Sequence, residues 1–334
     1  MVATGSILGR RGALLGALGA AAGLAAAGRG RAAAQAAPWP SRPIRVIVPY
    51  PPGGGSDTIA RIIYPRVSAR LGQPIVVENR GGATGTLGEA AAAQSAPDGH
   101  TLLHDAAAIA VNPALFRGLP FDPARDLQPV TMVVTFPNLL LARPSVPART
   151  VGEVIAMARA NPGGIAWASS GTGSNQHLSL VLFERAAGIR LNHVPYRGGG
   201  PAVQDVIAGS VPFVFGSASG ATGHARGGLL RAIAHTGTGR LPALPEVPPI
   251  AETLPGFESI DWQGVFVRRG TPPPIVDRLS AEIRAVLREP EIAERLVAGG
   301  AEPRPTTPAE FEARLRADMD RWAVLIREAD IRIE

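Results

Sequence analysis

Four short loops rich in Gly, Ser and Thr are the part of the sequence best suited to chemistry. They cover residues 52–57, 81–86, 169–174 and 197–200, and each follows an apolar run and precedes a helical pattern. The start of a helix presents backbone N–H groups without partners and a partial positive charge, so it attracts anions. A single loop of this kind is ordinary turn chemistry. Four of them predict a site for an anionic group such as a carboxylate.

Asp57, at the end of the first loop, fits two roles. It can complement the first turn of the helix that begins near Thr58, which stabilises a helix by about 1 kcal/mol. It can equally hold an ammonium or hydroxyl group of a ligand. The sequence leaves both roles open, and one residue can fill both.

Nucleotide-binding motifs are not met in these loops. The GGGSD string at 53–57 does not continue into the Lys-containing P-loop pattern, and the chain has no Lys. Gly171-Thr172-Gly173 starts like a dinucleotide fingerprint, but Gln176 stands where the third glycine belongs. We therefore expect neither kind of nucleotide site and no cofactor.

Signatures of catalysis and metal binding are missing as well. Ala218 stands where a G-x-S-x-G turn would carry its nucleophile. His100 and His104 are four residues apart, but with Asp105 alone they do not complete a metal site. His177 lies at the start of a predicted helix and is interpreted as a structural hydrogen-bonding residue. We expect no catalytic residue and no metal site.

The loops belong to an alternation of strands and helices. Strands are predicted at 44–48, 75–77, 102–104, 165–168, 193–196 and 211–215, and helices at 59–71, 88–94, 150–160, 176–187 and 201–208. This order indicates an α/β protein with parallel strands, in which the loops meet at the carboxyl edge of the sheet. The pattern restarts after about residue 140, so two lobes are expected, although no sequence repeat relates them.

The C-terminal third is predicted to be helical. An apolar stripe runs through Ile275, Leu279, Ile283 and Leu287. A capping box with Pro at the first helical position begins at Thr307. The inner face of that last helix is predicted to be core, as its helical spacing fully explains Phe311, Leu315, Met319, Trp322 and Ile326.

Residues 1–36 have the form of an export signal. Arg10 and Arg11 precede a short run of Ala, Gly and Leu, and an A-x-A pattern predicts cleavage between Ala36 and Ala37. The run is shorter than the roughly 20 apolar residues that a spanning helix needs. We expect a periplasmic protein, and the paired arginines raise the twin-arginine route as one way of export.

The positive charge of the chain does not indicate a nucleic-acid partner. The formal charge of +6 falls to +2 once residues 1–36 are set aside, because that segment holds four Arg and no acidic residue. No basic patch interleaved with aromatic residues follows. The absence of Cys excludes disulfides and thiolate metal sites.

Taken together, several strings resemble the Bug (TctC-like) solute receptors of tripartite tricarboxylate transporters. The first two are VPYPPGGGSD at 48–57 and VVENRGGA at 76–83. The resemblance continues in order through the rest of the chain, with PDGHTLL at 97–103, NPAL at 112–115, SSGTGS at 169–174, HVPYRG at 193–198, LPEVP at 244–248 and WQG at 262–264.

The resemblance implies a two-lobed periplasmic binding protein fold of the type II kind. Each lobe is then a mixed sheet flanked by helices, with the ligand cleft between the lobes. The expected division is a signal peptide at 1–36, a first lobe at 37–139 plus 262–334, and a second lobe at 140–261. It also implies ligand contacts from backbone and hydroxyl groups. Carried over by position, the candidates are Gly54, Ser56, Asp57, Ala83, Thr84, Gly85, Ser170, Thr172, Gly173 and Ser174, with Tyr196 and Arg197 within reach.

One departure from the family pattern concerns the identity of the ligand. Where relatives often have a Ser/Thr-rich loop after the third strand, this chain has Asp105 followed by three alanines. We count Asp105 among the candidate ligand contacts. The change favours a ligand with an apolar or cationic distal part, such as an aromatic acid or an amino acid, over a highly charged tricarboxylate.

The expected function is that of a receptor and not of an enzyme. The implied role is to capture a small carboxylate and deliver it to the membrane permease of the transporter, as a monomer without a nucleic-acid partner. Two alternatives stay open: a periplasmic sensor of a carboxylate, and an enzyme acting on small acids with the same scaffold.

Overall fold

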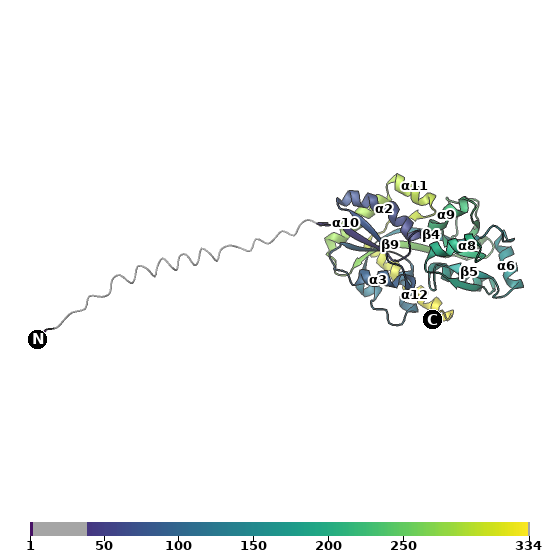
Figure 1. Ribbon diagram of the computed structural model, residues 1–334, viewed down its shortest axis with the longest axis horizontal. Helices are drawn as coiled ribbons and strands as arrows, with labels where there is room; N and C mark the ends of the chain where they lie inside the picture. The colour runs from purple at the N-terminus through teal and green to yellow at the C-terminus, as the bar shows by residue number, and fades with distance from the viewer. Residues whose placement is uncertain (3–38, 333–334) are drawn as a thin grey trace. The chain divides into compact units, whose positions relative to one another are not determined.

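The structure is a computed structural model that describes residues 1–2 and 39–332 (Figure 1). The chain divides into two units, Met1–Trp39 and Pro40–Glu334. The predicted export signal lies outside the described residues, and everything below concerns the second unit.

The first lobe is built on three parallel strands, with β1 in the centre. β1 is the apolar run IRVIV and is paired on either side by β2 and β3. These strands are β1 (Ile44–Val48), β2 (Ile75–Asn79) and β3 (Thr101–Ala106). Among the helices of this lobe are α2 (Gly55–Leu71), α3 (Thr86–Ala93) and α4 (Ala108–Leu115). α2 and α3 start in the loops that follow the strands, as predicted, whereas α4 was not predicted.

Two antiparallel strands join the lobes. β9 (Ile260–Arg268) pairs with β3 on one side and with β4 (Leu127–Ala142) on the other. β4 pairs with β9 as far as Pro137 and then, from Asn138, with β7 and β8. A single strand of 16 residues therefore passes from one lobe into the other.

The second lobe repeats the arrangement. β5 is flanked by β6 and β7 in parallel, and β7 and β8 run antiparallel to β4. Its strands are β5 (Ala166–Ser169), β6 (Asn192–Pro195), β7 (Phe213–Ser217) and β8 (Arg231–His235). Its helices are α6 (Val151–Ala160), α7 (Asn175–Ala187), α8 (Gly199–Ala208) and α9 (Ala218–Arg226).

The C-terminal helices return to the first lobe. They are α10 (Pro273–Leu287), α11 (Pro290–Ala298) and α12 (Pro308–Glu328). α12 begins with the predicted capping box, in which the Thr307 hydroxyl accepts from the Glu310 N–H and the Glu310 carboxylate accepts from the Thr307 N–H. The minor elements are η1 (Ala83–Gly85), α5 (Pro123–Asp126), η2 (Ile250–Glu252) and β10 (Glu302–Pro303).

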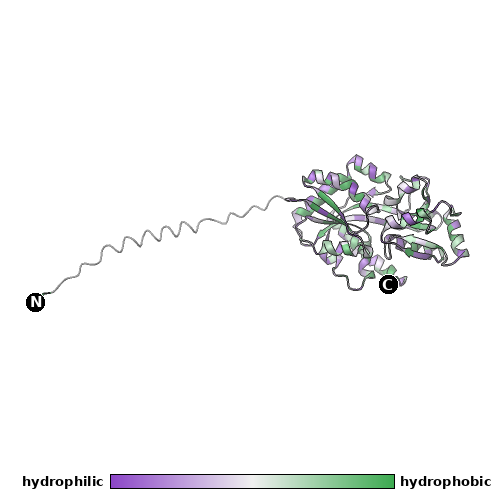
Figure 2. Ribbon diagram, in the orientation of Figure 1, coloured by the Kyte–Doolittle hydropathy of each residue, from purple (hydrophilic) through white to green (hydrophobic). Residues whose placement is uncertain are grey.

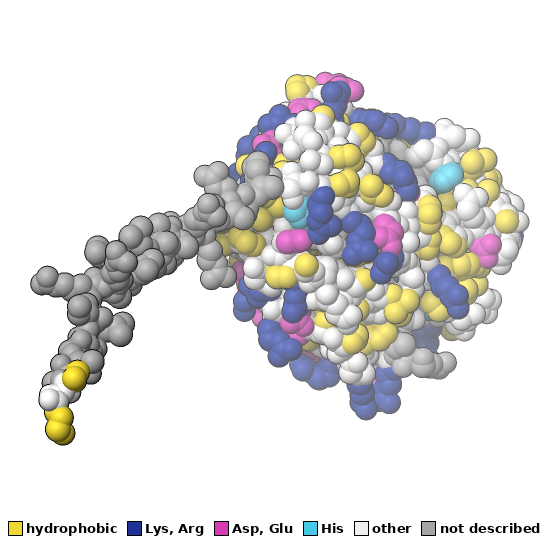
Figure 3. Space-filling view, turned by 60° about the vertical axis from the view of Figure 1, so that its left-hand side comes forward, with side chains coloured by type: hydrophobic (Ala, Val, Ile, Leu, Met, Phe, Trp, Pro, Cys, Tyr) yellow, Lys and Arg dark blue, Asp and Glu magenta, His cyan; other side chains and the backbone are white. Residues whose placement is uncertain are grey.

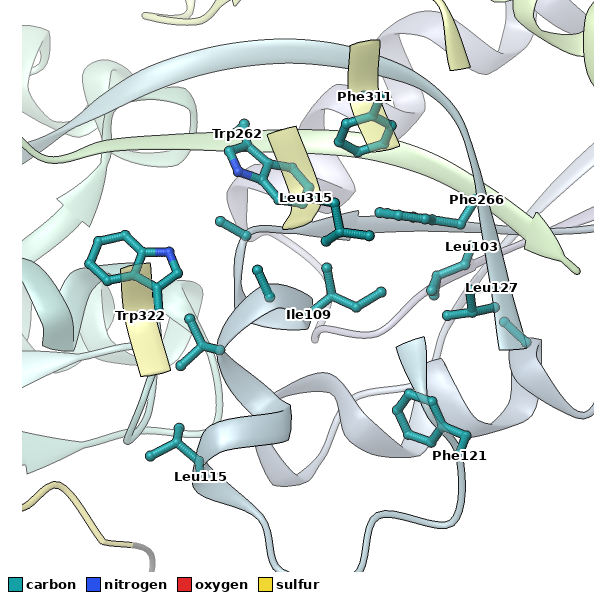
Figure 4. Close-up of a cluster of buried hydrophobic side chains, with 14 of the residues drawn as sticks. Leu103, Ile109, Leu115, Phe121, Leu127, Trp262, Phe266, Phe311, Leu315 and Trp322 are labelled. Atoms are coloured by element: carbon teal, nitrogen blue, oxygen red, sulfur yellow. The ribbon is translucent and has the colours of Figure 1, made fainter. Parts of the chain in front are cut away.

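Each lobe has its own hydrophobic core. The first is centred on Trp262, Phe266 and Phe311, with Trp322 of α12 closing one side (Figure 4). The second is centred on Trp167, whose ring stacks on Phe213 with centroids 4.9 Å apart. The apolar strands lie inside and the helices are amphipathic, as the hydropathy colouring shows (Figure 2). Two cores joined through β4 and β9 give the molecule its two lobes.

The sequence missed β4, β8, β9 and β10, and the prediction of a helical C-terminal third is wrong at β8, β9 and β10. β4 contains Pro129 and Pro137, which argue against a central strand, but Pro129 sits at a register shift where the ladder is already interrupted. β9 contains Gly264, which looks like a break. A Cβ there would lie 2.1 Å from the Phe311 ring, so the glycine makes room for the core.

The charge of the surface is spread out. Figure 3 shows Arg side chains scattered among acidic and apolar ones on the face in view. Many are paired with carboxylates, for example Arg70 with Glu282 at 2.7 Å. None of the described helices has the length and apolar character of a membrane span.

Candidate functional site

A narrow cavity of about 50 Å³ lies between the two lobes. Both lobes and both crossing strands contribute to its wall. The lining residues are Tyr50, Gly54, Gly55, Ser56, Thr84, Ala106, Ala108, Phe136, Ser170, Ser174, Asn175, Gln176, Gly199, Ser217, Asp261 and Gln263.

Helices α2, α7 and α9 begin at this cavity from different sides, and α4 and α8 also contribute their first residues to its lining. α2 brings Gly54 to Ser56, α7 brings Ser174 to Gln176, and α9 brings Ser217. The first turn of each helix leaves backbone N–H groups without helical partners and carries a partial positive charge. Because α2 belongs to the first lobe and α7 and α9 to the second, an anion held here would be gripped from both sides.

The loop before α7 is held in shape by its own hydroxyls and by a histidine. The Ser174 hydroxyl accepts from the His177 N–H at 3.2 Å and donates to the Gly171 carbonyl at 2.7 Å. The Gly173 N–H donates to His177 Nδ1 at 3.0 Å. Burial, together with His193, lowers the pKa of His177 to about 3, so the ring is neutral and able to accept this bond. His177 therefore has the structural role that the sequence predicted.

A serine and a histidine behind this loop lie close together without forming a usable catalytic pair. Ser169 Oγ and His193 Nε2 are 2.6 Å apart, which is the spacing of a nucleophile and its base. Ser169 is fully buried, however, and does not line the cavity. The ring of His193 also stacks on that of His177, with centroids 3.9 Å apart. The pair stiffens the loop.

The Asp57 carboxylate is occupied by the protein. It accepts from the Gly53 N–H at 3.0 Å, from Arg61 Nε at 3.0 Å and from Asn79 Nδ2 at 3.0 Å. Burial opposes ionisation, but these donors outweigh it and lower the pKa of Asp57. Its side chain ties the glycine loop to α2, while the neighbouring Ser56 faces the cavity. The observed contacts are those of the structural role.

The floor of the cavity is formed by Asp261 and Gln263 of β9. They are two residues apart, so they share one face of the strand while Trp262 points into the core on the other. Gln263 Oε1 lies 2.9 Å from His104 Nε2, and His104 Nδ1 lies 3.1 Å from the Tyr64 hydroxyl. Burial lowers the pKa of His104 to about 4, so the ring is neutral. A consistent hydrogen-bond chain then has Tyr64 donating to His104 and His104 to Gln263, which leaves the Gln263 amide N–H groups for the cavity.

Asp105 lies behind the cavity wall and not in it. Its Oδ1 accepts from the Tyr50 hydroxyl at 2.8 Å, and the residue is fully buried beside Glu89. Burial raises the pKa of both carboxyls. Tyr50, which lines the cavity, separates Asp105 from it. Asp105 can affect a ligand through the Tyr50 hydroxyl and through its electrostatic effect on Asp261.

A second hollow of about 290 Å³, the outer hollow, lies next to the first and shares part of its lining. Thr84 from the first lobe and Ser170 from the second line both hollows. Here the Thr84 hydroxyl donates to the Thr172 carbonyl at 3.1 Å, a direct bond between the lobes. Ala83 and Thr84 have φ angles of 45° and 55°, a strained conformation for residues other than glycine.

The structure places the predicted site residues in three groups. Gly54, Ser56, Thr84, Ser170 and Ser174 line the inner cavity. Ala83, Gly85, Thr172, Tyr196 and Arg197 line the outer hollow. Asp57, Asp105 and Gly173 lie outside both linings. Ser56 and Asp57 lie in the first turn of α2 and Asp105 lies on β3. The contact of the predicted residues with a ligand stays a prediction.

Residues of the crossing strands and of α9 were missed. Phe136, Asp261 and Gln263 lie on strands that the sequence did not reveal, and Ser217 was considered only as part of an incomplete hydrolase turn. The string around Trp262 was the one available signal, since a polar residue on each side of a core tryptophan alternates as in a strand. In the described residues no cluster of His, Asp and Glu could hold a metal ion.

The sequence comparisons agree with one another over most of the chain. Residues 59–331 match the family described as "Tripartite tricarboxylate transporter family receptor". The protein BugT of Bordetella pertussis is 37% identical over 299 residues, which cover 89% of this chain and 92% of that protein.

Solved structures show the same architecture. The periplasmic binding protein BugD has a TM-score of 0.84 at 31% identity, covering 89% of this chain and all of that one. MatC from Rhodopseudomonas palustris, solved with bound malate, has a TM-score of 0.81 at 34% identity, covering 86% of this chain and all of that one. The predicted two-lobed periplasmic binding protein fold is confirmed.

Proposed function

Because the chain belongs to the family of tripartite tricarboxylate transporter receptors, we propose that it is a periplasmic receptor for a small carboxylate. It binds the ligand between its lobes, closes around it and presents it to the membrane permease, and it performs no chemistry on it. The observation that carries the proposal is the convergence of α2, α7 and α9 on one cavity.

The donors at the cavity suit a carboxylate. The Ser56 and Ser217 side chains line it, and Asn175 Nδ2 has no hydrogen-bond partner among the described residues. A carboxylate needs several donors on two oxygens, and three helix starts with nearby hydroxyl and amide groups supply them. No Arg lines the inner cavity, so the attraction comes from backbone dipoles and neutral donors.

Closure of the lobes follows from the same geometry. An anion between α2 of the first lobe and α7 and α9 of the second is bound completely only when the lobes are together. Hinged closure around a ligand is the usual motion of two-lobed receptors. β4 between Pro137 and Asn138, where its pairing partners change, is where we place the hinge.

Thermal unfolding of the purified protein against a panel of carboxylates tests the binding. A ligand present at 100 times its dissociation constant is expected to stabilise the folded state by about 2.7 kcal/mol. Neutral sugars and simple amines serve as controls. If only the controls raise the melting temperature, the carboxylate assignment is wrong.

Two further measurements separate a receptor from its alternatives. Mass spectrometry of the ligand after incubation with stoichiometric protein is expected to recover it unchanged, and conversion would establish an enzyme. Uptake of the labelled ligand by cells lacking the gene is expected to fall. Normal uptake together with a lost transcriptional response to the ligand would establish a sensor.

A further inference from the structure

Among the described residues, Asp261 is the one acidic side chain that lines the inner cavity. It is 3% exposed and sits on β9 opposite Phe136 of β4. Its Oδ1 accepts from its neighbour Trp262 N–H at 2.8 Å and from the Ala107 N–H at 3.4 Å. Oδ2 has no hydrogen-bond partner among the described residues. A carboxyl group buried at a binding cavity thus keeps one oxygen free.

The protein supplies no cation for this carboxyl group. No Arg or His of the described residues forms an ion pair with Asp261. The ionisable neighbours that act on it are themselves acidic, namely Asp105 on β3 and Asp318 on α12. Tyr50 also lies within electrostatic range, and His104 on β3 is neutral. A buried carboxylate without a partner is costly, and a positively charged group is what satisfies it.

The rest of the lining has the opposite character. The starts of α2, α7 and α9 present N–H groups and partial positive charge, and Gln263 beside Asp261 adds amide N–H donors. The cavity therefore has an anion-binding wall and an acceptor on its floor. A ligand that carries charge of only one sign can satisfy either the helix starts or Asp261, but not both.

We propose that the cleft selects a zwitterionic acid, whose carboxylate lies at the helix starts and whose ammonium group donates to Asp261 Oδ2. Amino acids are the simplest ligands of this class. The inference rests on the proposed function and specifies its ligand. The rival is a diacid, whose second carboxyl would accept a hydrogen bond from a protonated Asp261.

Calorimetry with matched pairs of acids tests the inference. The probes are L-aspartate against succinate, L-glutamate against glutarate and L-alanine against propionate, since each pair differs by the amine. At pH 8 at least one amino acid is expected to bind tenfold or more tightly than its partner. Partners that bind equally well or better overturn the inference and leave the proposed function standing. Binding of no carboxylate at all overturns both.

Substitution of Asp261 shows whether this residue is responsible. Asp261→Asn keeps the shape and the Oδ1 acceptor, and it is expected to bring the two members of the preferred pair within about threefold. Glu184→Gln is the matched control, because Glu184 is a partly buried carboxyl on α7 that bonds the Leu191 N–H away from the cavity. An amine preference that survives in Asp261→Asn would overturn the assignment.

The pH dependence of wild-type binding gives a test that needs no variant. Burial, with smaller effects of Asp318 and Asp105, raises the pKa of Asp261 to about 7. An ammonium group pairs with the ionised form, so amino-acid affinity is expected to rise about tenfold between pH 6 and pH 8. A diacid pairing with the protonated form would bind less tightly over the same range, and that result would refute the inference.

Discussion

Asp261→Asn should stabilise the ligand-free protein, and by an amount that grows with pH. The folded pKa of Asp261 is about 7 against 3.8 for an ordinary Asp. The folded state therefore keeps its proton where the unfolded state has lost it, and stability is lost as pH rises from about 4 to about 7. A difference of about 3 pKa units corresponds to about 4 kcal/mol as an upper limit above pH 7.

The variant removes this pH-dependent cost. Asn has nearly the same shape as Asp, and its Oδ1 can still accept from Trp262 and Ala107. The free energies of unfolding of wild type and variant are expected to be similar near pH 4 and to separate in favour of the variant by about 1 to 4 kcal/mol at pH 8. Urea denaturation of both proteins at pH 4.5, 6, 7 and 8 measures the difference.

Asp57→Asn is a control in which the pH-dependent change in stability is expected to have the opposite sign. The pKa of Asp57 is lowered because its donors outweigh its burial, so its stabilising contribution is present above its unfolded pKa and is lost as pH falls. This variant is expected to be less stable than wild type at pH 8, and the deficit should shrink toward pH 4. An Asp261→Asn protein that is no more stable than wild type at pH 8, while Asp57→Asn behaves as stated, would refute the account of the cavity floor.

Three other substitutions probe the walls of the cleft. Thr84→Val removes the bond to the Thr172 carbonyl and should weaken ligand binding about 2- to 12-fold, the equivalent of 0.5–1.5 kcal/mol, while Thr84→Ser retains the bond and the affinity. Gly55→Ala places a Cβ 2.4 Å from Ser219 Oγ and should weaken ligand binding by about 1 to 3 kcal/mol, as measured by titration calorimetry. A second substitution, Ser219→Ala, should restore part of the lost affinity. Gln263→Leu should leave folding intact by circular dichroism. It should lower carboxylate affinity by about tenfold, because a donor to a charged group is lost. Unchanged affinity in any of these three variants would contradict the geometry described.

The sequence predicted the loops of the cleft and the helices α2, α3, α7 and α8 well because local rules govern them, although it missed α4 and α9. The Thr307 capping box and the Gly/Ser-rich helix starts depend on residues within one turn of each other. α2 starts at Gly55, four residues before the predicted start at Ile59. This small error also concerns a local feature of the chain. Apolar spacing marks where a helix becomes buried and not where it begins.

The floor of the cavity could not be predicted because it depends on pairing over long distances. The paired residues of β4 and β9 are at least 123 positions apart in the chain, and proline in one strand and glycine in the other hide them. Their regularity comes from tertiary partners: Gly264 is set by the Phe311 ring and not by its sequence neighbours. Asp105, in contrast, was visible as an acidic residue after a strand, but nothing in its neighbourhood in the chain indicated that the Tyr50 hydroxyl would donate to it.

The two surfaces of the cavity divide the work of recognition. The helix starts of α2, α7 and α9 come from both lobes, so a carboxylate bound among them stabilises the closed state whatever else the ligand carries. Asp261 and Gln263 lie on a strand that runs between the lobes, and their positions relative to one another are fixed by a single backbone. A ligand group that contacts them meets a rigid surface. A poor fit between that group and the two side chains cannot be relieved by a different degree of lobe closure. Closure of the lobes should therefore depend on the presence of a carboxylate, while the affinity should depend on the ligand group that contacts Asp261.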